Sequence, residues 1–262
     1  MNMITSRDNP NIKEIIKLQK SAKQRRDTGL FTVEGVRLCR DAALSGAKIN
    51  KLVYTKQAME KYSDDFKLIS DSGCEKIEVS ADIFLKISDT KSPQGLLCVI
   101  SMLDKSILVD KIENTGRYVA LENISDPSNL GTILRTAEAL GLDGIILSED
   151  CCDVYSPKVA RGSMGAVFRM KFCIAENFTG FISELTKKGI KTYAATPRDA
   201  VSVTELGLKS GIVLIGNEGA GLTDETISAC SQRIKIPMGG RAESLNASAA
   251  AAILMWELIR SK

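Results

Sequence analysis

The sequence predicts an α/β protein in two parts: a small N-terminal α/β unit and a C-terminal domain built on a mainly parallel sheet. Short apolar runs of strand length alternate with helix-length segments, which is typical of a parallel sheet covered on both faces. A charged, weakly patterned stretch at residues 102–116 interrupts the alternation, which then restarts. Hydrophobic residues make up 44% of the chain and charged residues 26%, as in ordinary globular proteins.

The elements expected in the N-terminal part form a small alternating unit. In chain order they are a helix at 33–45, strands at 49–55 and 76–80, a helix at 81–88 and a strand at 95–101. We therefore place an N-terminal domain at 1–101 and a linker or bridging helix at 102–116.

The elements expected in the C-terminal part define a domain at 117–262. Its strands are predicted at 117–123, 144–148, 190–196, 211–218 and 233–238, and its helices at 129–140, 178–188, 223–230 and 244–260. Gly141 is placed to cap the first of these helices. In such parallel sheets, ligands bind at the carboxyl ends of the strands.

Composition excludes several kinds of chemistry. The chain has 262 residues and no histidine, which removes the commonest general base and the commonest metal ligand. Its seven cysteines form no C-x-x-C pair, so we expect reduced thiols and no metal site. The N-terminus has no apolar signal-peptide core and no apolar run reaches the ~18–20 residues of a membrane helix, so we expect a cytoplasmic protein.

Polar residues and glycines gather where three predicted strands end. The first strand ends in Glu122 and Asn123 and turns at Asp126 toward a helix. The others end in the loops at 216–221 and 239–240. Glycines let the backbone approach a ligand closely, whereas each loop by itself is also explained by turns and helix caps. Three such loops at successive strand ends favour a ligand site.

The loop G-N-E-G-A-G at 216–221 is not a dinucleotide fingerprint. It has the spacing G-x-x-G-x-G, and the helix after it opens with Asp224 and Glu225, which would repel a pyrophosphate. The chain also lacks the G-x-x-x-x-G-K-[ST] phosphate loop. Nicotinamide and nucleoside-triphosphate sites are therefore disfavoured.

A basic segment near the N-terminus is a candidate RNA surface. In a helix, apolar residues such as Ile12 and Ile15 fall on one side and Lys13, Lys17 and Lys20 on the other. The segment continues with Lys23, Arg25 and Arg26, and the net charge of the chain is +3. Such a stripe is either an ordinary solvated face or a phosphate-contacting patch.

Three ordered motifs resemble those of the SpoU-type (TrmH-like) 2′-O-ribose RNA methyltransferases of the SPOUT class. The first is N-x-x-D-P-x-N-x-G-x-x-x-R from Asn123 to Arg135, the second is I-G-N-E-G-x-G-L from Ile215 to Leu222, and the third runs from Ile236 to Ser248. The segment 161–170 also resembles a sequence segment of this family. The segment 31–44 resembles the family's N-terminal substrate-binding domain, a small ribosomal-protein-like RNA-binding fold. Ala247 departs from the usual valine of the third motif.

The resemblance implies a fold, a cofactor and an assembly. The C-terminal domain is expected to contain a deep trefoil knot whose loops bind S-adenosylmethionine, in an obligate homodimer. The reaction implied is methylation of a ribose 2′-hydroxyl, without metal. Because an added N-terminal domain resembles the ribosomal-RNA enzymes, we expect large-subunit ribosomal RNA as the substrate.

The resemblance also assigns residues. The catalytic set is Asn129, Arg135, Glu218, Ser244 and Asn246. The cofactor set is Leu214, Ile215, Gly216, Asn217, Gly219, Ile236, Met238, Ser244 and Leu245. The RNA set, from the basic segment and the 161–170 segment, is Lys13, Lys17, Lys20, Arg25, Arg26 and Arg161.

Some alternatives stay open. Arg135 is expected near the strand-end pocket, where it would clamp a phosphate and stabilise an oxyanion, but a guanidinium is a poor proton acceptor. Glu218 is the other candidate base if burial raises its pKa. Ser244 is also placed to cap the last helix. The competing functions are a transfer-RNA ribose methyltransferase, a catalytically inactive RNA-binding or ribosome-associated knot protein, and an α/β enzyme that does not act on RNA.

Overall fold

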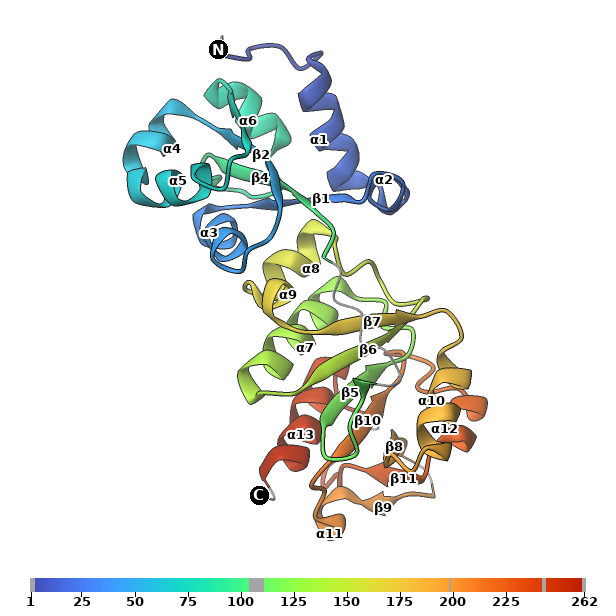
Figure 1. The fold of residues 1–262 in the computed structure, drawn as a ribbon. Helices are drawn as coiled ribbons and strands as arrows, with labels where there is room; N and C mark the ends of the chain where they lie inside the picture. The colour runs from blue at the N-terminus through green and yellow to red at the C-terminus, as the bar shows by residue number, and fades with distance from the viewer. Residues whose placement is uncertain (1–2, 104–110, 198, 242–243, 261–262) are drawn as a thin grey trace. The chain divides into compact units, whose positions relative to one another are not determined.

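A computed structural model describes residues 3–103, 111–197, 199–241 and 244–260 (Figure 1). The chain forms two compact units, each described here by itself. The N-terminal unit contains the described residues of 1–104 together with 153–169, and the C-terminal unit contains those of 105–152 and 170–262. Residues 104–110 of the predicted linker at 102–116 lie outside the described residues.

The N-terminal unit is built on a four-stranded mixed sheet with the order β1-β4-β2-β3. Strand β4 is antiparallel to both β1 and β2, and β3 is parallel to β2. The strands are β1 (Leu30–Glu34), β2 (Ile49–Tyr54), β3 (Glu75–Glu78) and β4 (Leu96–Ser101). This small α/β unit agrees with the sequence prediction.

Helices cover this sheet, and amphipathic spacing explains how α1 does so. Its residues Ile12, Ile15 and Leu18 are buried against β4 residues such as Leu97 and against α6, so its lysines face solvent. The helices of the unit are α1 (Pro10–Lys20), α2 (Ala22–Thr28), α3 (Val36–Leu44), α4 (Lys56–Lys61), α5 (Ser63–Ser70), α6 (Ala81–Ile87), α8 (Pro157–Gly162) and α9 (Ala166–Arg169).

The segment that carries α8 and α9 belongs by its contacts to the N-terminal unit, although in sequence it lies inside the predicted C-terminal domain. The rings of Tyr155 and Phe168 lie 4.9 Å and 6.2 Å from the ring of Phe31 on β1. All three aromatic side chains are buried. The sheet of the N-terminal unit therefore obtains part of its cover from a segment more than 120 residues further along the chain.

The C-terminal unit is built on a seven-stranded sheet in which every recorded strand pair is parallel, as predicted. Its order is β7-β6-β5-β10-β8-β11-β9. The strands are β5 (Arg117–Leu121), β6 (Gly144–Ser148), β7 (Phe172–Ala175), β8 (Thr192–Ala195), β9 (Val201–Ser202), β10 (Gly211–Ile215) and β11 (Gln232–Lys235). Strands β6 and β7 extend to one side of β5 and β10 lies on the other side, so the carboxyl ends of β5 and β10 meet at a topological switch point.

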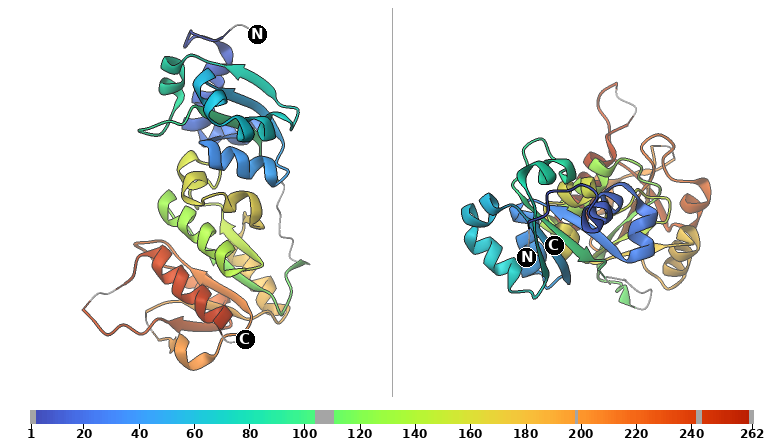
Figure 2. Two further views of the ribbon diagram at one scale, coloured as in Figure 1. Left: turned by 90° about the vertical axis from the view of Figure 1, so that its left-hand side faces the viewer. Right: turned by 90° about the horizontal axis from the view of Figure 1, so that it is seen from above.

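Two helical layers enclose this sheet. On one face α7 (Pro127–Leu140) and α13 (Ala247–Arg260) lie side by side (Figure 2). On the other face α10 (Phe178–Lys187) and α12 (Asp224–Ala229) pack on the sheet, and α11 (Val203–Leu206) follows β9. Successive strand residues point to opposite faces of the sheet, and helices cover both faces, so the residues on both sides of β5 and β10 are buried.

The structure corrects the boundaries of several predicted elements. The predicted helix at 33–45 begins only at Val36, because β1 continues to Glu34 and Gly35 breaks the chain direction with φ +99°. Strands β1, β7 and β9 and helices α4, α5, α8, α9 and α11 were not predicted. The helix expected at 129–140 begins at Pro127, and Gly141 caps it with φ +70° as predicted. None of the helices among the described residues combines the length and apolar character that crossing a bilayer requires.

Candidate active site

A cavity of about 300 Å³ lies at the carboxyl ends of β8, β10 and β11 in the C-terminal unit. Its walls are the segments that follow these strands and the first turns of α13. The lining residues are Ala195, Thr196, Pro197, Ile215, Gly216, Asn217, Glu218, Gly219, Ala220, Gly221, Ile234, Lys235, Ile236, Met238, Ser244, Leu245, Ala247, Ala250 and Leu254. The cavity thus brings the second and third sequence motifs together at the edge of the sheet where ligands bind in this fold class.

The loop after β10 is a tight turn that bonds to itself. The backbones of Asn217 and Gly221 exchange two hydrogen bonds of 3.0 and 2.9 Å, and the Asn217 side-chain oxygen accepts from the N–H groups of Gly219 and Ala220. A Cβ on Gly216 would overlap the backbone at Gly221, so this position requires glycine. The loop therefore presents a backbone surface of fixed shape to the cavity.

Glu218 joins this loop to the first motif. Its carboxylate accepts hydrogen bonds from the Ser125 N–H (3.1 Å), the Ser125 hydroxyl (2.9 Å), the Asp126 N–H (3.1 Å) and the Asn129 amide (2.9 Å). Burial acts to raise the pKa of Glu218, but the hydrogen bonds from Asn129, Ser125 and Asp126 outweigh it and lower the pKa to about 2. The condition under which Glu218 was a candidate base, a pKa raised by burial, is therefore not met, and a carboxylate with this pKa is a weak proton acceptor.

The third motif is joined to the same network through two carboxamides. Asn129 is buried, and its side-chain oxygen accepts from the Asn246 amide at 3.0 Å. The Asn246 oxygen in turn accepts from the N–H groups of Ser248 (2.9 Å) and Ala249 (3.4 Å) at the start of α13. Asn246 therefore caps this helix, and the expectation that Ser244 would do so is wrong.

The turn that follows β5 is held by two side chains from the end of β6. The Asn123 N–H donates to the Ser148 hydroxyl at 2.8 Å, and the Asn123 backbone adopts φ +53°. The Cys151 thiol accepts from the Ile124 N–H and donates to the Leu121 carbonyl, each at 3.3 Å. Burial raises the pKa of Cys151, so the thiol keeps the proton that this second bond requires.

Two further contacts fix the turn after β5 to the loop after β10. The Asn217 amide donates to the Asn123 carbonyl at 2.8 Å. The buried Glu122 carboxylate accepts from the N–H and hydroxyl of Thr223 at 2.8 and 2.9 Å, and from the Thr226 hydroxyl at 2.6 Å. Glu122 thereby anchors the end of the loop at α12. Sequence analysis placed Glu122 at a strand end but assigned it no role.

Most of the predicted cofactor residues line the cavity, and Leu214 does not. Leu214 is fully buried in the core cluster with Phe178 and Ile182 on the α10 side of the sheet. Its neighbour Ile215 lines the cavity instead, because successive strand residues face opposite sides. The lining residues Ala195 to Pro197 were missed, although they lie at the carboxyl end of the strand predicted at 190–196, and that position was the available signal.

Arg135 is placed differently from the sequence expectation. It follows Asn129 by six residues, which is a rotation of about 240° around a helix, so the two side chains leave different faces of α7. Arg135 is exposed on the same face as Ser128 and Thr132, and it is not among the residues that line the cavity of its own chain.

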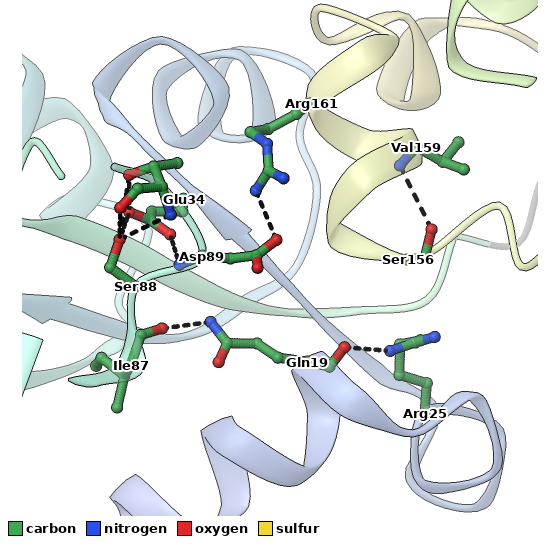
Figure 3. Close-up of polar contacts among 10 residues, drawn as sticks. Gln19, Arg25, Glu34, Ile87, Ser88, Asp89, Ser156, Val159 and Arg161 are labelled. Atoms are coloured by element: carbon green, nitrogen blue, oxygen red, sulfur yellow. Dashed lines mark hydrogen bonds and ion pairs between the residues drawn. The ribbon is translucent and has the colours of Figure 1, made fainter. Parts of the chain in front are cut away.

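The predicted RNA residues divide into exposed and engaged ones. Lys17, Lys20 and Arg26 are exposed, as is Lys13, which pairs with Asp8 at 2.9 Å. Other predicted members of the set are bound within the N-terminal unit (Figure 3).

Arg25 is the clearest correction to the RNA set, because only 4% of it is exposed. Its guanidinium bonds to the Asp153 carboxylate and to the Leu18 and Gln19 carbonyls. Arg161 bonds to the Asp89 carboxylate at 2.9 Å. Arg25 is therefore a structural residue. Arg161 binds its own segment, which carries α8, to Asp89 in the rest of the N-terminal unit.

The arrangement of the two units and the cavity defines a class of protein. An all-parallel sheet with a glycine-lined cavity at the carboxyl ends of its strands, joined to a second α/β unit with a basic helix, is an α/β enzyme domain with a separate substrate-binding domain. Among the described residues, no group of three or more His, Cys, Asp or Glu side chains is placed to hold a metal ion.

Comparison with known families identifies the chain within that class. The model of the SpoU rRNA Methylase family matches residues 116–256, and that of the MRM3-like substrate binding domain matches residues 9–98. The chain belongs to the SpoU rRNA methylase family, as the three motifs indicated.

Relatives of the same length support this assignment. The 23S rRNA (guanosine(2553)-2′-O)-methyltransferase RlmP of Bacillus subtilis is 29% identical over 261 residues, covering 98% of this chain and 99% of the relative. The AdoMet-bound rRNA methyltransferase from Sinorhizobium meliloti is 32% identical with a TM-score of 0.87, covering 98% of this chain and 97% of that one. The SpoU methyltransferase AviRb from Streptomyces viridochromogenes, in complex with AdoMet, is 25% identical with a TM-score of 0.86, covering 96% and 97%.

Proposed function

We propose that this protein is an S-adenosylmethionine-dependent methyltransferase that methylates a ribose 2′-hydroxyl in large-subunit ribosomal RNA. The observation that carries the proposal is the hydrogen-bonded chain from Glu218 through Asn129 to Asn246, which joins one residue of each motif beside a single cavity. The names of the ribosomal RNA methyltransferases that match nearly the whole chain support the substrate class.

The cavity fits the cofactor in size and lining. Its volume of about 300 Å³ is at the lower end of the range for small-molecule sites, roughly 300–1,000 Å³. Apolar side chains such as Ile215, Ile236 and Leu254 provide walls for the adenine and the methionine chain, and the backbone of the 216–221 loop provides hydrogen-bonding groups. The deep knot that the resemblance implies for these loops stays a prediction.

The side chains of the site position the reactants rather than activate them. When bound, S-adenosylmethionine would supply a methyl group on a sulfonium sulfur: the S–C bond would break to leave a neutral thioether as the new C–O bond forms, and the proton of the 2′-hydroxyl would pass to solvent. Glu218 holds the turn at Ser125 and Asp126, and Asn129 and Asn246 hold the start of α13 against it. Alignment of this kind can supply a large part of the rate, on the order of 7–11 kcal/mol in favourable cases.

We further propose a homodimer in which the site of one copy is completed by the other. Ile253 and Trp256 are 38% and 53% exposed on α13, an unusual position for two large apolar side chains on one helix face. Arg135 lies on the exposed face of α7, which packs beside α13. In a dimer formed through this face, Arg135 of one copy would lie near the cavity of the other copy, where it would bind the phosphate next to the target ribose.

The N-terminal unit is proposed to dock the RNA. The exposed basic residues Lys13, Lys17, Lys20 and Arg26 form the surface of α1 and α2 that can contact phosphates. The match to a substrate-binding domain over residues 9–98 supports this role.

Two measurements test the proposal. Calorimetry in the presence of a chelator should show binding of S-adenosylmethionine, and no binding, or binding that depends on a divalent metal, would refute it. Mapping of ribose methylation in total RNA from cells with and without the gene should show one lost position in large-subunit ribosomal RNA. Loss of a transfer-RNA position would identify the other substrate class, and no loss would identify an inactive RNA-binding protein.

The dimer is tested by mixing two inactive variants. Arg135→Ala and Glu218→Ala chains, refolded together, should regain methyl transfer because one hybrid site then contains both side chains. Failure of the mixture, although hybrid dimers form, would place Arg135 and Glu218 in the same site of one chain.

A further inference from the structure

A second cavity of about 300 Å³ opens on the surface of the N-terminal unit. It lies between α4, the start and middle of α6, and the chain just before β4. Its lining residues are Thr55, Gln57, Ala58, Lys61, Tyr62, Ala81, Phe84, Leu85, Pro93, Gln94 and Gly95. None of these residues belongs to the three motifs of the methyltransferase site.

The segment 88–95, which contains the cavity wall at Pro93 to Gly95, is held at its start and near its end. At one end the buried Glu34 carboxylate accepts from the Ser88 hydroxyl, the Asp89 N–H and the Thr90 hydroxyl at 2.5 to 2.9 Å (Figure 3). At the other end the Gln94 side-chain oxygen accepts from the Val36 N–H at 3.0 Å. The cavity is therefore preorganised, which lowers the entropic cost of filling it.

The glycine of this wall is required by its close approach to α4. Gly95 has φ +80°, and a Cβ there would lie 2.5 Å from the Thr55 hydroxyl oxygen and 2.8 Å from the Ala58 Cβ. Its carbonyl accepts from the Thr55 N–H at 3.0 Å. The loop is thus fixed directly against the first turn of α4.

The lining combines an aromatic ring, exposed apolar surface, amides and an ammonium. Tyr62 is half-buried, and Leu85 is 59% exposed, a large fraction for a leucine next to a cavity. Because the Gln94 oxygen is engaged by the backbone, the group that Gln94 offers a ligand is its NH₂ donor. The Lys61 ammonium lies 5.2 Å from the centre of the Tyr62 ring.

We infer that this cavity binds an unpaired nucleobase of the RNA substrate, an inference that rests on the proposed function. The base stacks on Tyr62 and Leu85, and the Gln57 and Gln94 amides contact its edge. An exposed cation–π contact is weaker than base–aromatic stacking, so the base displaces the Lys61 ammonium from the face of the Tyr62 ring. The displaced ammonium then lies beside the ring, where it contacts a phosphate of the RNA backbone.

The occupant follows from the lining and from the domain. The cavity lies within the residues that match a substrate-binding domain. Glu60 is adjacent to Lys61 on α4, and Asp82 lies on α6, so charge alone does not select an anion here. Stacking surface and amide donors select a flat ligand with polar edges, and in an RNA substrate that ligand is a base.

Leu85→Ser tests the inference with little risk to folding, since the side chain is exposed. The matched control is Leu44→Ser, on α3 of the same unit, where the leucine is 63% exposed. Binding of fluorescein-labelled oligouridylate and oligoadenylate to the full-length protein is measured by anisotropy, with a short RNA duplex as the second probe. We expect Leu85→Ser to weaken binding of the single strands at least about five-fold, as for loss of one stacking contact, and to leave duplex binding unchanged. The Leu44→Ser protein should bind all of these probes like wild type.

Tyr62 provides an independent pair of variants. Tyr62→Ala should weaken single-strand binding, and Tyr62→Phe, which keeps the ring, should retain it. Oligonucleotides with 4-thiouridine should crosslink to the peptides that contain Tyr62 or Leu85. The inference is overturned if wild-type protein binds neither single strand, if Leu85→Ser binds like Leu44→Ser, or if crosslinks fall only elsewhere.

Failure of this inference can be separated from failure of the proposed function. The Leu85→Ser and wild-type proteins should bind S-adenosylmethionine with equal affinity, because that cavity is in the C-terminal unit. Wild-type protein without cofactor binding would refute the proposed function whatever the oligonucleotides show. Normal cofactor binding and ribosomal RNA methylation with no effect of Leu85→Ser would refute only the base-binding cavity.

Discussion

Replacing Glu218 by glutamine tests whether this residue holds the site together or takes a proton. Each carboxylate oxygen accepts two hydrogen bonds: one from the N–H and hydroxyl of Ser125, the other from Asp126 and Asn129. Glutamine turns one oxygen into an NH₂ group, which must face two donors, so two hydrogen bonds are lost. At about 0.5–1.5 kcal/mol for each bond, the free energy of unfolding should fall by about 1–3 kcal/mol.

The pKa gives a second figure for the same network. A fall from 4.5 to about 2 would correspond to ~3 kcal/mol in a dry site. Glu218 is exposed to solvent, and screening reduces the expected contribution to about 1–2 kcal/mol. Both figures agree within their range, and they predict a lower melting temperature by roughly 2–8 °C for a unit of this size.

The assay combines thermal melting, cofactor titration and single-turnover methyl transfer at saturating RNA. We expect Glu218→Gln to slow transfer and weaken cofactor binding, with the pH dependence of the rate unchanged in shape, because Glu218 is ionised throughout the neutral range. Glu225→Gln, on the exposed first turn of α12, is the matched control and should behave as wild type. A kinetic pKa between about 5 and 8 that is present in wild type and absent in Glu218→Gln would refute the reasoning and make Glu218 the base.

The remaining predictions concern three other parts of the chain. Gly216→Ala should abolish cofactor binding in calorimetry and lower the unfolding free energy by at least about 1–3 kcal/mol, because its Cβ overlaps backbone. Normal cofactor binding by this variant would contradict the close backbone approach at Gly216. Arg25→Ala should lower the unfolding free energy by about 3–5 kcal/mol in denaturant titrations, and the neighbouring exposed Arg26→Ala by at most about 0.5 kcal/mol. Equal effects of the two arginine variants would contradict the buried ion pair. Cys151→Ala should cost about 1–2 kcal/mol and raise the dissociation constant for S-adenosylmethionine, Cys151→Ser should retain both values, and equal loss in both variants would assign Cys151 to packing alone.

Sequence periodicity was sufficient to predict the central strands of the parallel sheet, which helices cover on both faces in this fold class. Strands β5, β6, β8 and β10 are buried along most of their length because helices cover both faces, and the apolar character that this requires is visible without the structure. The edge strand β7 was missed because two of its four residues are not buried. Strand β1 was missed because its residues Val33 and Glu34 continue into a helical pattern, and only the positive φ of Gly35 separates the two elements.

The motifs predicted which residues lie near the site better than they predicted where each side chain points. Gly216, Asn217 and Glu218 of the second motif and Ser244 of the third line one cavity, because strand ends in a parallel sheet meet at one edge. The faces of Leu214 and Arg135 were not predicted correctly, since a motif specifies a residue type at a position but not which side of the strand or helix meets the ligand. The role of Arg25 was also missed, because its partner Asp153 is 128 residues away.

By itself the sequence determined the two-part α/β organisation, the parallel sheet, the three strand-end loops and the family, since these depend on local periodicity and on residue types at short spacing. Only the tertiary structure decided that the α8 and α9 segment covers the N-terminal sheet, that Asn129 connects Glu218 to Asn246, and that a preorganised cavity lies between α4 and α6. Each of these depends on contacts between residues that are distant in the chain. Their geometry is set by the packing of whole layers, which no local pattern of residues encodes.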